Sequence, residues 1–354
     1  MSKFKFIFLF FTWNALHFAC TESGKHKEMP RQKILVTHPE VPQVAIDLMK
    51  TSFDVIICES VPPKRSEILE KAKGVDGIFW GSHEPLNAEV LDIVGPQLKA
   101  ISTMSAGIDY VDIAELKKRK IPLGHTPEVL NNAVADLAVG LMIAAARRFH
   151  EGRNKIDSSQ WENYHLQWML GQDIQDSVVG FFGFGKIGQT IAKRLSGFDL
   201  DHILYTTHHR IDKDLELEYS ASKVPFDEML RSSDFIFIAA PLTKETQGVF
   251  NASAFALMKK NAVLINIARG PIVKQDDLYE ALKSNQIFAA GLDVVTPEPL
   301  PSNDKLLSLP NCVVIPHLGS ATLKTRTDMA TIAAHNVMRG IAGESMFAPA
   351  YSIA

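Results

Sequence analysis

Cysteine is scarce in this sequence, with Cys20, Cys58 and Cys312 the only three among 354 residues. They stand far apart and form no Cys-x-x-Cys pair, so we predict neither a disulfide framework nor a metal site. The plain interpretation is two core thiols in a reducing compartment and a third in a terminal tail.

An excess of charge of one sign is also lacking. The chain has 37 Lys and Arg against 40 Asp and Glu, for a formal net charge of −3. A basic surface for nucleic acid is therefore not indicated, and we expect no nucleic-acid partner. Internal repeats and low-complexity tracts are absent, and 46% hydrophobic with 22% charged residues is an ordinary globular composition. A chain of this length suits two domains.

Long apolar runs are missing except near the start. Two lysines precede an apolar run at residues 6–11, and the first acidic residue is Glu22. This order is typical of a secretory signal or a membrane-inserting leader, although polar interruptions make the segment short for a spanning helix. An upstream extension without a role is the alternative. We treat residues 1–30 as an N-terminal extension and expect a cytoplasmic protein with no membrane contact beyond such a leader; secretory or organelle targeting stays open.

Short apolar runs alternate with helical stretches from residue 31 onward, which predicts an α/β fold with parallel sheets. Buried strands are expected at residues 33–37, 54–58, 77–80 and 98–102, and again at 177–182, 202–206, 235–239, 262–267, 289–294 and 312–315; helices are expected at 42–52 and 324–340. We predict two Rossmann-like domains, the second inserted into the first. Residues 31–130 and 318–348 form one domain, residues 131–317 form the other, and a ligand cleft lies between them.

Residues 132–148 are almost wholly apolar, favour a helix and end in two arginines. Basic residues suit the C-terminal end of a helix because of its dipole. A helix that is apolar on nearly every face has to be covered all round. Its own sheet or a second subunit could provide that cover.

Residues 183–188, Gly-Phe-Gly-Lys-Ile-Gly, fit the pattern Gly-x-Gly-x-x-Gly. The pattern is weak alone, but here it follows an apolar strand and precedes a helical stretch at 189–195, as in dinucleotide-binding turns. Gly183 would permit the tight turn, Gly185 the approach of a pyrophosphate, and Gly188 the packing of helix on strand. A glycine-rich turn without a ligand is the alternative.

The strand after such a turn ends in an acid when an NAD ribose is bound through its 2′-hydroxyl. Here that strand ends in Thr206, followed by His208, His209 and Arg210. An acid would repel a 2′-phosphate, whereas a hydroxyl, imidazoles and a guanidinium would accept one. We therefore predict NADP(H) as the preferred cofactor of domain 131–317. A polar loop that accepts NADP(H) or NAD(H) is the alternative.

Three ionisable residues follow three predicted strands, namely Arg269, Glu298 and His317. Ligands bind beyond the carboxyl ends of the strands in such sheets, so the three could converge on the cofactor. A guanidinium can hold the carboxylate of a 2-keto acid, and an imidazolium can protonate its carbonyl oxygen. A carboxylate behind the imidazole favours the charged form. Each residue alone has an alternative interpretation without a catalytic role: Arg269 as a surface charge, Glu298 as a solvated acid, and His317 as a core histidine. Together they favour a dehydrogenase that moves a hydride between a nicotinamide and a small 2-keto or 2-hydroxy acid.

Four segments carry a resemblance to a known family: FFGFGKIGQTIAKRL, INIARGPIV, AAGLDVVTPEPLP and VVIPHLGSAT. With them, residues from about 31 to 346 resemble the D-isomer-specific 2-hydroxyacid dehydrogenases, and within that family most the glyoxylate reductase/hydroxypyruvate reductases. The resemblance implies that Arg269, Glu298 and His317 are catalytic, and that domain 31–130 with 318–348 binds the substrate.

The same resemblance implies further contacts. The backbone of Ala106 and Gly107 would bind the substrate carboxylate, with Ser320 nearby; a turn of small residues after a strand can indeed offer N–H groups to an anion. Trp168 would line the active site of a neighbouring subunit in a homodimer formed through the helix near 132–148; core packing is the alternative. The cofactor contacts implied, beyond the turn and the Thr206 loop, are Lys186, Ile187, Pro241, Ile267, Asp293 and Gly319.

Three functions remain open on the sequence. The favoured one is reduction of glyoxylate and hydroxypyruvate to glycolate and D-glycerate with NADPH. A second keeps the chemistry but uses another substrate, such as D-3-phosphoglycerate or a broader range of keto acids. A third is a non-catalytic, dinucleotide-sensing module of the corepressor kind. Turnover of a keto acid separates the third from the others.

Overall fold

The computed structural model describes residues 30–161, 163 and 165–352. Gln32–Ala354 form one compact unit. The predicted leader and Cys20 lie outside the described residues. Within the described ranges, no helix has both the length and the apolar character needed to cross a membrane. The cytoplasmic location and the targeting alternative stay predictions.

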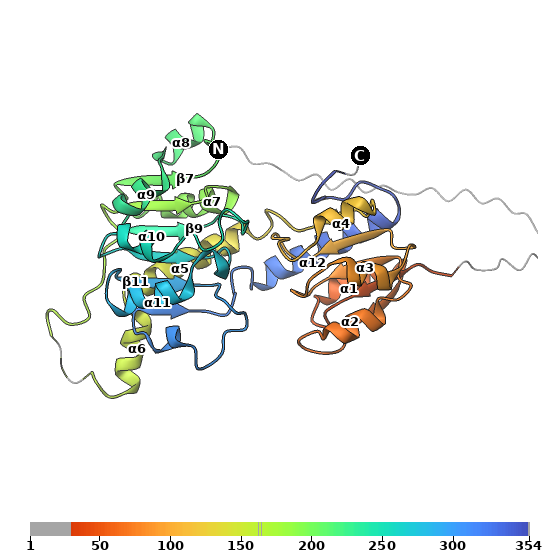
Figure 1. Cartoon of the computed structure of the whole chain (residues 1–354), viewed down its shortest axis with the longest axis horizontal. Helices are drawn as coiled ribbons and strands as arrows, with labels where there is room; N and C mark the ends of the chain where they lie inside the picture. The colour runs from red at the N-terminus through yellow and green to blue at the C-terminus, as the bar shows by residue number, and fades with distance from the viewer. Residues whose placement is uncertain (1–29, 162, 164, 353–354) are drawn as a thin grey trace, which may run out of the picture. The chain divides into compact units, whose positions relative to one another are not determined.

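A five-stranded parallel sheet forms the first part of the fold (Figure 1). Its order is β2-β1-β3-β4-β5, so the strand order reverses between β1 and β3. The strands are β1 (Lys33–Val36), β2 (Asp54–Ile57), β3 (Gly77–Trp80), β4 (Ala100–Thr103) and β5 (Leu123–Gly124), and the helices between them are α1 (Gln43–Lys50), α2 (Arg65–Lys71), α3 (Ala88–Val94) and α4 (Ile113–Lys118).

A seven-stranded parallel sheet follows, in the order β12-β11-β10-β9-β6-β7-β8. Its strand order reverses between β6 and β9, where open α/β sheets bind their ligands. The strands are β6 (Val178–Phe182), β7 (His202–Thr206), β8 (Ala221–Lys223), β9 (Phe235–Ile238), β10 (Val263–Asn266), β11 (Ala289–Leu292) and β12 (Cys312–Val314). The helices are α5 (Asn131–Ala146), α6 (Phe149–Asp157), α7 (Lys186–Leu195), α8 (Lys213–Glu218), α9 (Phe226–Ser232), α10 (Ala252–Leu257) and α11 (Gln275–Lys283), with short 3-10 helices η1 (Gly270–Ile272) and η2 (Lys305–Ser308).

The last helix, α12 (Leu323–Ile341), returns the chain to the first sheet. Its buried residues Ala330, Ala334 and Val337 pack with Ile34 and Phe79. The second sheet is therefore inserted into the domain that holds the first. This confirms the predicted fold class of two Rossmann-like domains with parallel sheets, one inserted into the other. Which domain binds substrate and which binds cofactor stays a prediction at this point.

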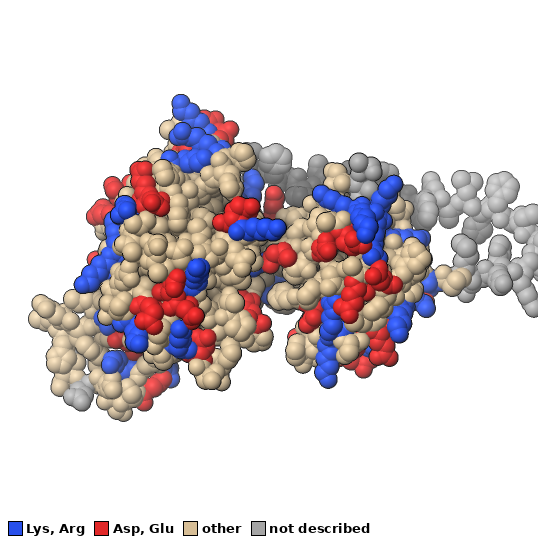
Figure 2. All heavy atoms as spheres, viewed as in Figure 1, with Lys and Arg blue, Asp and Glu red and all other residues tan. Residues whose placement is uncertain are grey.

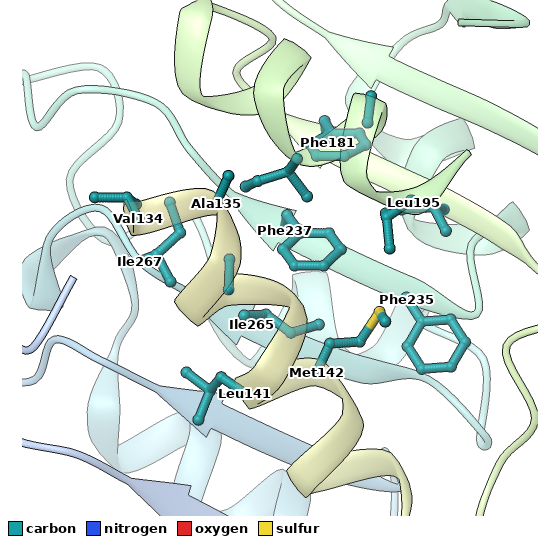
Figure 3. Close-up of a cluster of buried hydrophobic side chains, with 14 of the residues drawn as sticks. Val134, Ala135, Leu141, Met142, Phe181, Leu195, Phe235, Phe237, Ile265 and Ile267 are labelled. Atoms are coloured by element: carbon teal, nitrogen blue, oxygen red, sulfur yellow. The ribbon is translucent and has the colours of Figure 1, made fainter. Parts of the chain in front are cut away.

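Helix α5 covers one face of the second sheet. Leu141 and Met142 of this helix belong to one cluster of buried side chains with Phe237 and Ile265 of the strands (Figure 3). Burial of a leucine-sized side chain contributes about 1.5–3 kcal/mol, so this cluster is a main source of stability for the second domain.

The described chain covers this helix only in part, so cover of the remaining face by a second subunit stays a prediction. Asn132, Asp136 and Gly140 form an exposed stripe on it, and Arg194 of α7 binds the first two at 2.7 Å each. The helix also ends at Ala146 rather than Arg148, because Arg148 adopts a left-handed conformation (φ 57°) and α6 starts after it.

Other boundaries differ from those predicted as well. The strand expected at 98–102 is β4, Ala100–Thr103: Leu98 is buried but lies in a turn, where its N–H donates to the Gly95 carbonyl. Apolar character in the sequence indicates that a residue is buried, but not whether its backbone lies in a strand or in a turn. The sequence alone therefore could not separate the turn at Leu98 from the strand that follows it. The helix expected from Gln189 begins at Lys186, inside the glycine pattern.

Cys58 and Cys312 are free and buried, as predicted. Burial raises the pKa of the Cys58 thiol to about 11 and that of Cys312 to about 12, so both stay protonated. Figure 2 shows acidic and basic side chains mixed over the viewed face, in line with the nearly balanced charge.

Candidate active site

The glycine pattern forms a turn directly after β6. Gly183 has a φ of +90°, and a Cβ there would lie 2.6 Å from the Ala240 backbone nitrogen, so no other residue fits without a shift. Its N–H donates to the Thr206 carbonyl at the end of β7 (3.0 Å). Gly185 caps the N-terminus of α7, and a Cβ there would meet nothing within 4 Å. The turn is therefore open to an incoming group above Gly185.

Gly188 lies in the first turn of α7, where the helix packs against the glycine turn. A Cβ there would lie 3.0 Å from the Gly183 carbonyl oxygen and 3.2 Å from the Phe184 ring, so the helix packs tightly on the strand. Lys186 and Ile187 lie in the first helical turn and are not buried. The unpaired N–H groups at the start of α7, with open space before them, fit the pyrophosphate of a dinucleotide.

The loop after β7 holds the residues predicted to select the cofactor. His208 and His209 are exposed, and Thr206 is partly buried at the end of the strand. Arg210 has an internal partner that the sequence did not reveal. Its Nε donates to both carboxylate oxygens of Glu216 (2.8 and 3.0 Å).

Arg269 lies just beyond β10, in a turn that Asn266 holds. The Asn266 side chain donates to the Arg269 carbonyl (3.0 Å) and accepts from the Ala268 N–H (3.1 Å). A Cβ on Gly270 would lie 2.0 Å from the Val295 carbonyl oxygen. Glycine at 270 therefore lets the loop that bears Arg269 touch the loop that bears Glu298.

The Arg269 guanidinium reaches the first domain. Its Nε donates to the Asp109 carboxylate (2.9 Å), and one terminal nitrogen donates to the backbone carbonyl of Ala268 (2.8 Å). A Cβ on Gly107 would lie 1.8 Å from the other terminal nitrogen of Arg269, so only glycine at position 107 leaves room for the guanidinium. Within the described part of the chain, the N–H groups of Ala106 and Gly107 donate to no protein acceptor. A guanidinium and two open amides thus meet at one turn, as an anion site requires.

Glu298 and His317 form a hydrogen-bonded pair. Glu298 Oε2 accepts from His317 Nδ1 at 2.8 Å, and its Oε1 accepts from the Val295 N–H at 3.1 Å. The carboxylate oxygen can only accept when ionised, so the bond fixes the proton on Nδ1. No residue of the described ranges bonds His317 Nε2, which is left for a substrate.

The electrostatics of this pair favour an ionised carboxylate. Burial alone would raise the pKa of Glu298, but the hydrogen bond and charge of His317, with the Val295 N–H, hold that pKa below its usual value. The carboxylate is therefore charged throughout the neutral range, behind an imidazole that can carry a proton.

Asp293 fixes the loop that presents His317. It is buried, and its carboxylate accepts from the N–H groups of Leu318 (2.5 Å) and Gly319 (3.0 Å). Burial raises the pKa of Asp293 despite these bonds. Ser320 follows in the same loop and is partly buried.

The other residues predicted to contact cofactor or substrate are spread around this region. Ile267 is buried after β10, and Pro241 is exposed in the loop after β9. Trp168 is 37% exposed, so core packing within the described chain is wrong for it.

Sequence reasoning missed Asp109, Asn266, His83 and Tyr110. His83, after β3, stacks on His317 with ring centroids 5.7 Å apart, and Tyr110 meets His83 edge-on at 6.1 Å. The rule that ligands bind beyond strand ends, applied to the first sheet as well, would have pointed to His83.

Comparison with known proteins places this geometry in a family. A family model described as D-isomer specific 2-hydroxyacid dehydrogenase, NAD binding domain, matches residues 139–319. The chain is 43% identical over 288 residues to a glyoxylate reductase/hydroxypyruvate reductase of Homo sapiens, covering 81% of this chain and 87% of that protein. It is 39% identical over 319 residues to a glyoxylate reductase of Thermofilum pendens, covering 89% and 93%.

A solved structure of similar fold supports the same family. The NADPH-dependent glyoxylate/hydroxypyruvate reductase of Sinorhizobium meliloti, in complex with NADP and malonate, is 26% identical with a TM-score of 0.76, covering 90% of this chain and 96% of that one. The family match, the open glycine turn and the histidine–glutamate pair all point the same way. This chain belongs to the D-isomer-specific 2-hydroxyacid dehydrogenases, oxidoreductases that use a nicotinamide dinucleotide.

Proposed function

We propose that this protein reduces glyoxylate and hydroxypyruvate to glycolate and D-glycerate, with NADPH as the preferred cofactor. The observation that carries the proposal is the His317–Glu298 pair, whose free imidazole nitrogen is available to an acceptor. The names of the relatives in man and in Thermofilum pendens support the substrate class.

In this proposal Arg269 and the first domain hold the substrate carboxylate. The terminal guanidinium nitrogen beside Gly107 and the open N–H groups of Ala106 and Gly107 supply the donors. Charge-assisted hydrogen bonds of this kind are short and strong, and a two-pronged grip fixes orientation as well as position. Asp109 holds the guanidinium by its Nε, so the arginine is positioned before substrate arrives. Ser320 is proposed to contact the substrate from the loop of His317.

His317 is proposed as the proton donor. The reduced nicotinamide, when bound, supplies the hydride that reaches C2 of the keto acid. Negative charge then develops on the carbonyl oxygen, and a proton on His317 Nε2 neutralises it. Glu298 stabilises the imidazolium through the 2.8 Å bond to Nδ1 and keeps the ring in place. Asp293, through the N–H groups of Leu318 and Gly319, keeps the loop in the productive shape.

The second domain is proposed to hold the dinucleotide, and the first to hold the acid. The pyrophosphate of the dinucleotide would lie over Gly185 and the start of α7, with Lys186 and Ile187 beside it. The rest of the dinucleotide site would be lined by Pro241, Ile267, Asp293 and Gly319. The preference for NADP(H) is supported by Thr206 in place of an acid and by the exposed His208 and His209. Arg210 contributes less net charge than the sequence suggested, because Glu216 already pairs with it.

We also propose a homodimer in which Trp168 lines the partner's active site. The segment from α6 to residue 170 exposes large apolar side chains, among them Leu166 at 83% and Trp168 at 37%. Exposed apolar residues gathered on one segment are typical of protein interfaces. Sedimentation equilibrium tests this: a dimer is expected, and a monomer at micromolar concentration would contradict it.

A steady-state assay tests the substrate and the cofactor together. Glyoxylate, hydroxypyruvate, pyruvate and phosphohydroxypyruvate are each tried with NADPH and with NADH. The proposal expects the highest kcat/KM for glyoxylate or hydroxypyruvate with NADPH. A preference for phosphohydroxypyruvate would assign the enzyme to another substrate. NADPH binding without turnover of any keto acid would indicate a dinucleotide-sensing module instead.

A further inference from the structure

His83 lies at the carboxyl end of β3 in the first sheet, and no feature of the sequence assigned it a role. Its loop is anchored rather than free. The Glu84 N–H donates to the Ser82 hydroxyl (3.0 Å), and Leu86 exchanges backbone hydrogen bonds with Tyr110 (3.0 Å) and Asp112 (2.9 Å). The backbone that follows His83 is therefore anchored to Ser82 and to the chain at 110–112.

The ring of His83 lies nearly parallel to that of His317. The interplanar angle is 19° and the centroids are 5.7 Å apart. Tyr110 supports His83 from another side, edge-on at 6.1 Å, and the Tyr110 hydroxyl is itself bonded to Ser105 (2.6 Å). No hydrogen bond to a His83 ring nitrogen occurs within the described residues. His83 therefore contacts His317 through the face of its ring.

The face of a neutral aromatic ring attracts a cation within about 6 Å of its centroid. His317 becomes such a cation when it carries the proton for reduction. His83 itself stays neutral there: burial lowers its pKa, and the charge of His317 lowers it further. The charged groups around His83 are His317, Glu298, Arg269 and Arg326, of which Glu298 alone favours protonation of His83.

We propose that His83 is a positioning residue of this active site, whose ring face supports the protonated form of His317. The inference rests on the proposed function, in which His317 donates the proton. It predicts a property of the free enzyme as well as of turnover, so it can fail while the proposed function stands.

The test compares His83→Leu, which removes the ring face, with His83→Phe, which keeps a ring face and removes the nitrogens. Two quantities are measured. The first is the alkaline limb of kcat/KM for keto-acid reduction against pH, which reports groups of the free enzyme. The second is the NMR titration of the His317 ring without cofactor or substrate. His83→Gln serves as a second ring-free variant, and NADPH binding verifies the fold of each variant.

In His83→Leu and His83→Gln, we expect the alkaline limb and the His317 titration to move to lower pH by about half a unit, as loss of a weak cation–π contact implies. His83→Phe should keep both near the wild-type position. His38→Leu is the matched control, because His38 lies at the same edge of the first sheet, after β1, and makes no ring contact with His317 within the described residues. It should move neither.

Two results would overturn the inference. One is an unchanged limb and titration in His83→Leu. The other is an equal shift in His83→Phe and His83→Leu, which would assign the effect to the ring nitrogens. If the wild type reduced no keto acid, the proposed function would fail, and the NMR titration would still decide the role of the His83 ring.

Discussion

Glu298→Gln isolates the charge behind His317 with little change of shape. The glutamine oxygen can still accept from His317 Nδ1, so the ring orientation should be kept, and only the negative charge is lost. A hydrogen bond that involves a charged group contributes about 1.5–3 kcal/mol and a neutral one about 0.5–1.5. The difference is about 1–1.5 kcal/mol. The two side chains are 35% and 32% exposed, so solvent screening reduces the difference to about 1 kcal/mol.

The sign of the pH effect follows from the direction of the reaction. In the proposed mechanism reduction needs a protonated His317, so activity is expected to fall as pH rises. The pKa of Glu298 is held below its usual value, and its charge is therefore present across the assay range. Loss of about 1 kcal/mol moves the alkaline limb of kcat/KM down by about 0.7 pH unit, because one unit corresponds to about 1.4 kcal/mol.

The assay is steady-state NADPH oxidation with glyoxylate from pH 5.5 to 9. Above the limb, Glu298→Gln should lose about fivefold in kcat/KM, since a shift of about 0.7 unit is a factor of about five. Below the limb it should approach the wild type. Glu344→Gln, an exposed partner of Arg339 at the far end of α12, is the control and should behave as the wild type. A loss of equal size at every pH would refute the reasoning, because it would mean that Glu298 acts on something other than the proton of His317.

Two further predictions concern the cofactor. Gly188→Ala should destabilise the fold by about 1–3 kcal/mol, because the new methyl meets Gly183 and Phe184 at 3.0 and 3.2 Å, whereas Gly185→Ala should keep the melting temperature and lose NADPH affinity. Thermal melts and fluorescence titration separate the two, and the reverse pattern would contradict the turn described. Thr206→Asp should weaken NADPH binding by about tenfold or more and spare NADH, as a carboxylate repels a 2′-phosphate; an equal loss for both would argue against a 2′-phosphate at Thr206.

The fold was predictable because its signals are local. The central parallel strands are largely buried, so apolar runs such as 77–80 and 202–206 marked β3 and β7 to the residue. Boundaries failed where burial and conformation separate, as at Leu98, or where one residue changes conformation, as at Arg148. Neither event leaves a periodic signal in the sequence.

The site was predictable only in part. Arg269, Glu298 and His317 could be named because each follows a strand of one sheet, and strand ends share an edge. Asp109 could not, since its bond to Arg269 joins residues 160 positions apart in two domains. The strand-end rule could have marked His83 as a candidate, but its stack on His317 depends on how the first sheet presents its loops. Such pairings arise from tertiary packing, and no spacing rule anticipates them.

His317→Ala, compared with the wild type, tests the central claim most directly. The two measurements are NADPH affinity by fluorescence titration and turnover of glyoxylate and hydroxypyruvate at one pH below the alkaline limb. The account predicts NADPH affinity within about twofold of the wild type and a fall of at least about 100-fold in kcat, as loss of a general acid implies. Turnover that matches the wild type with both substrates would contradict it.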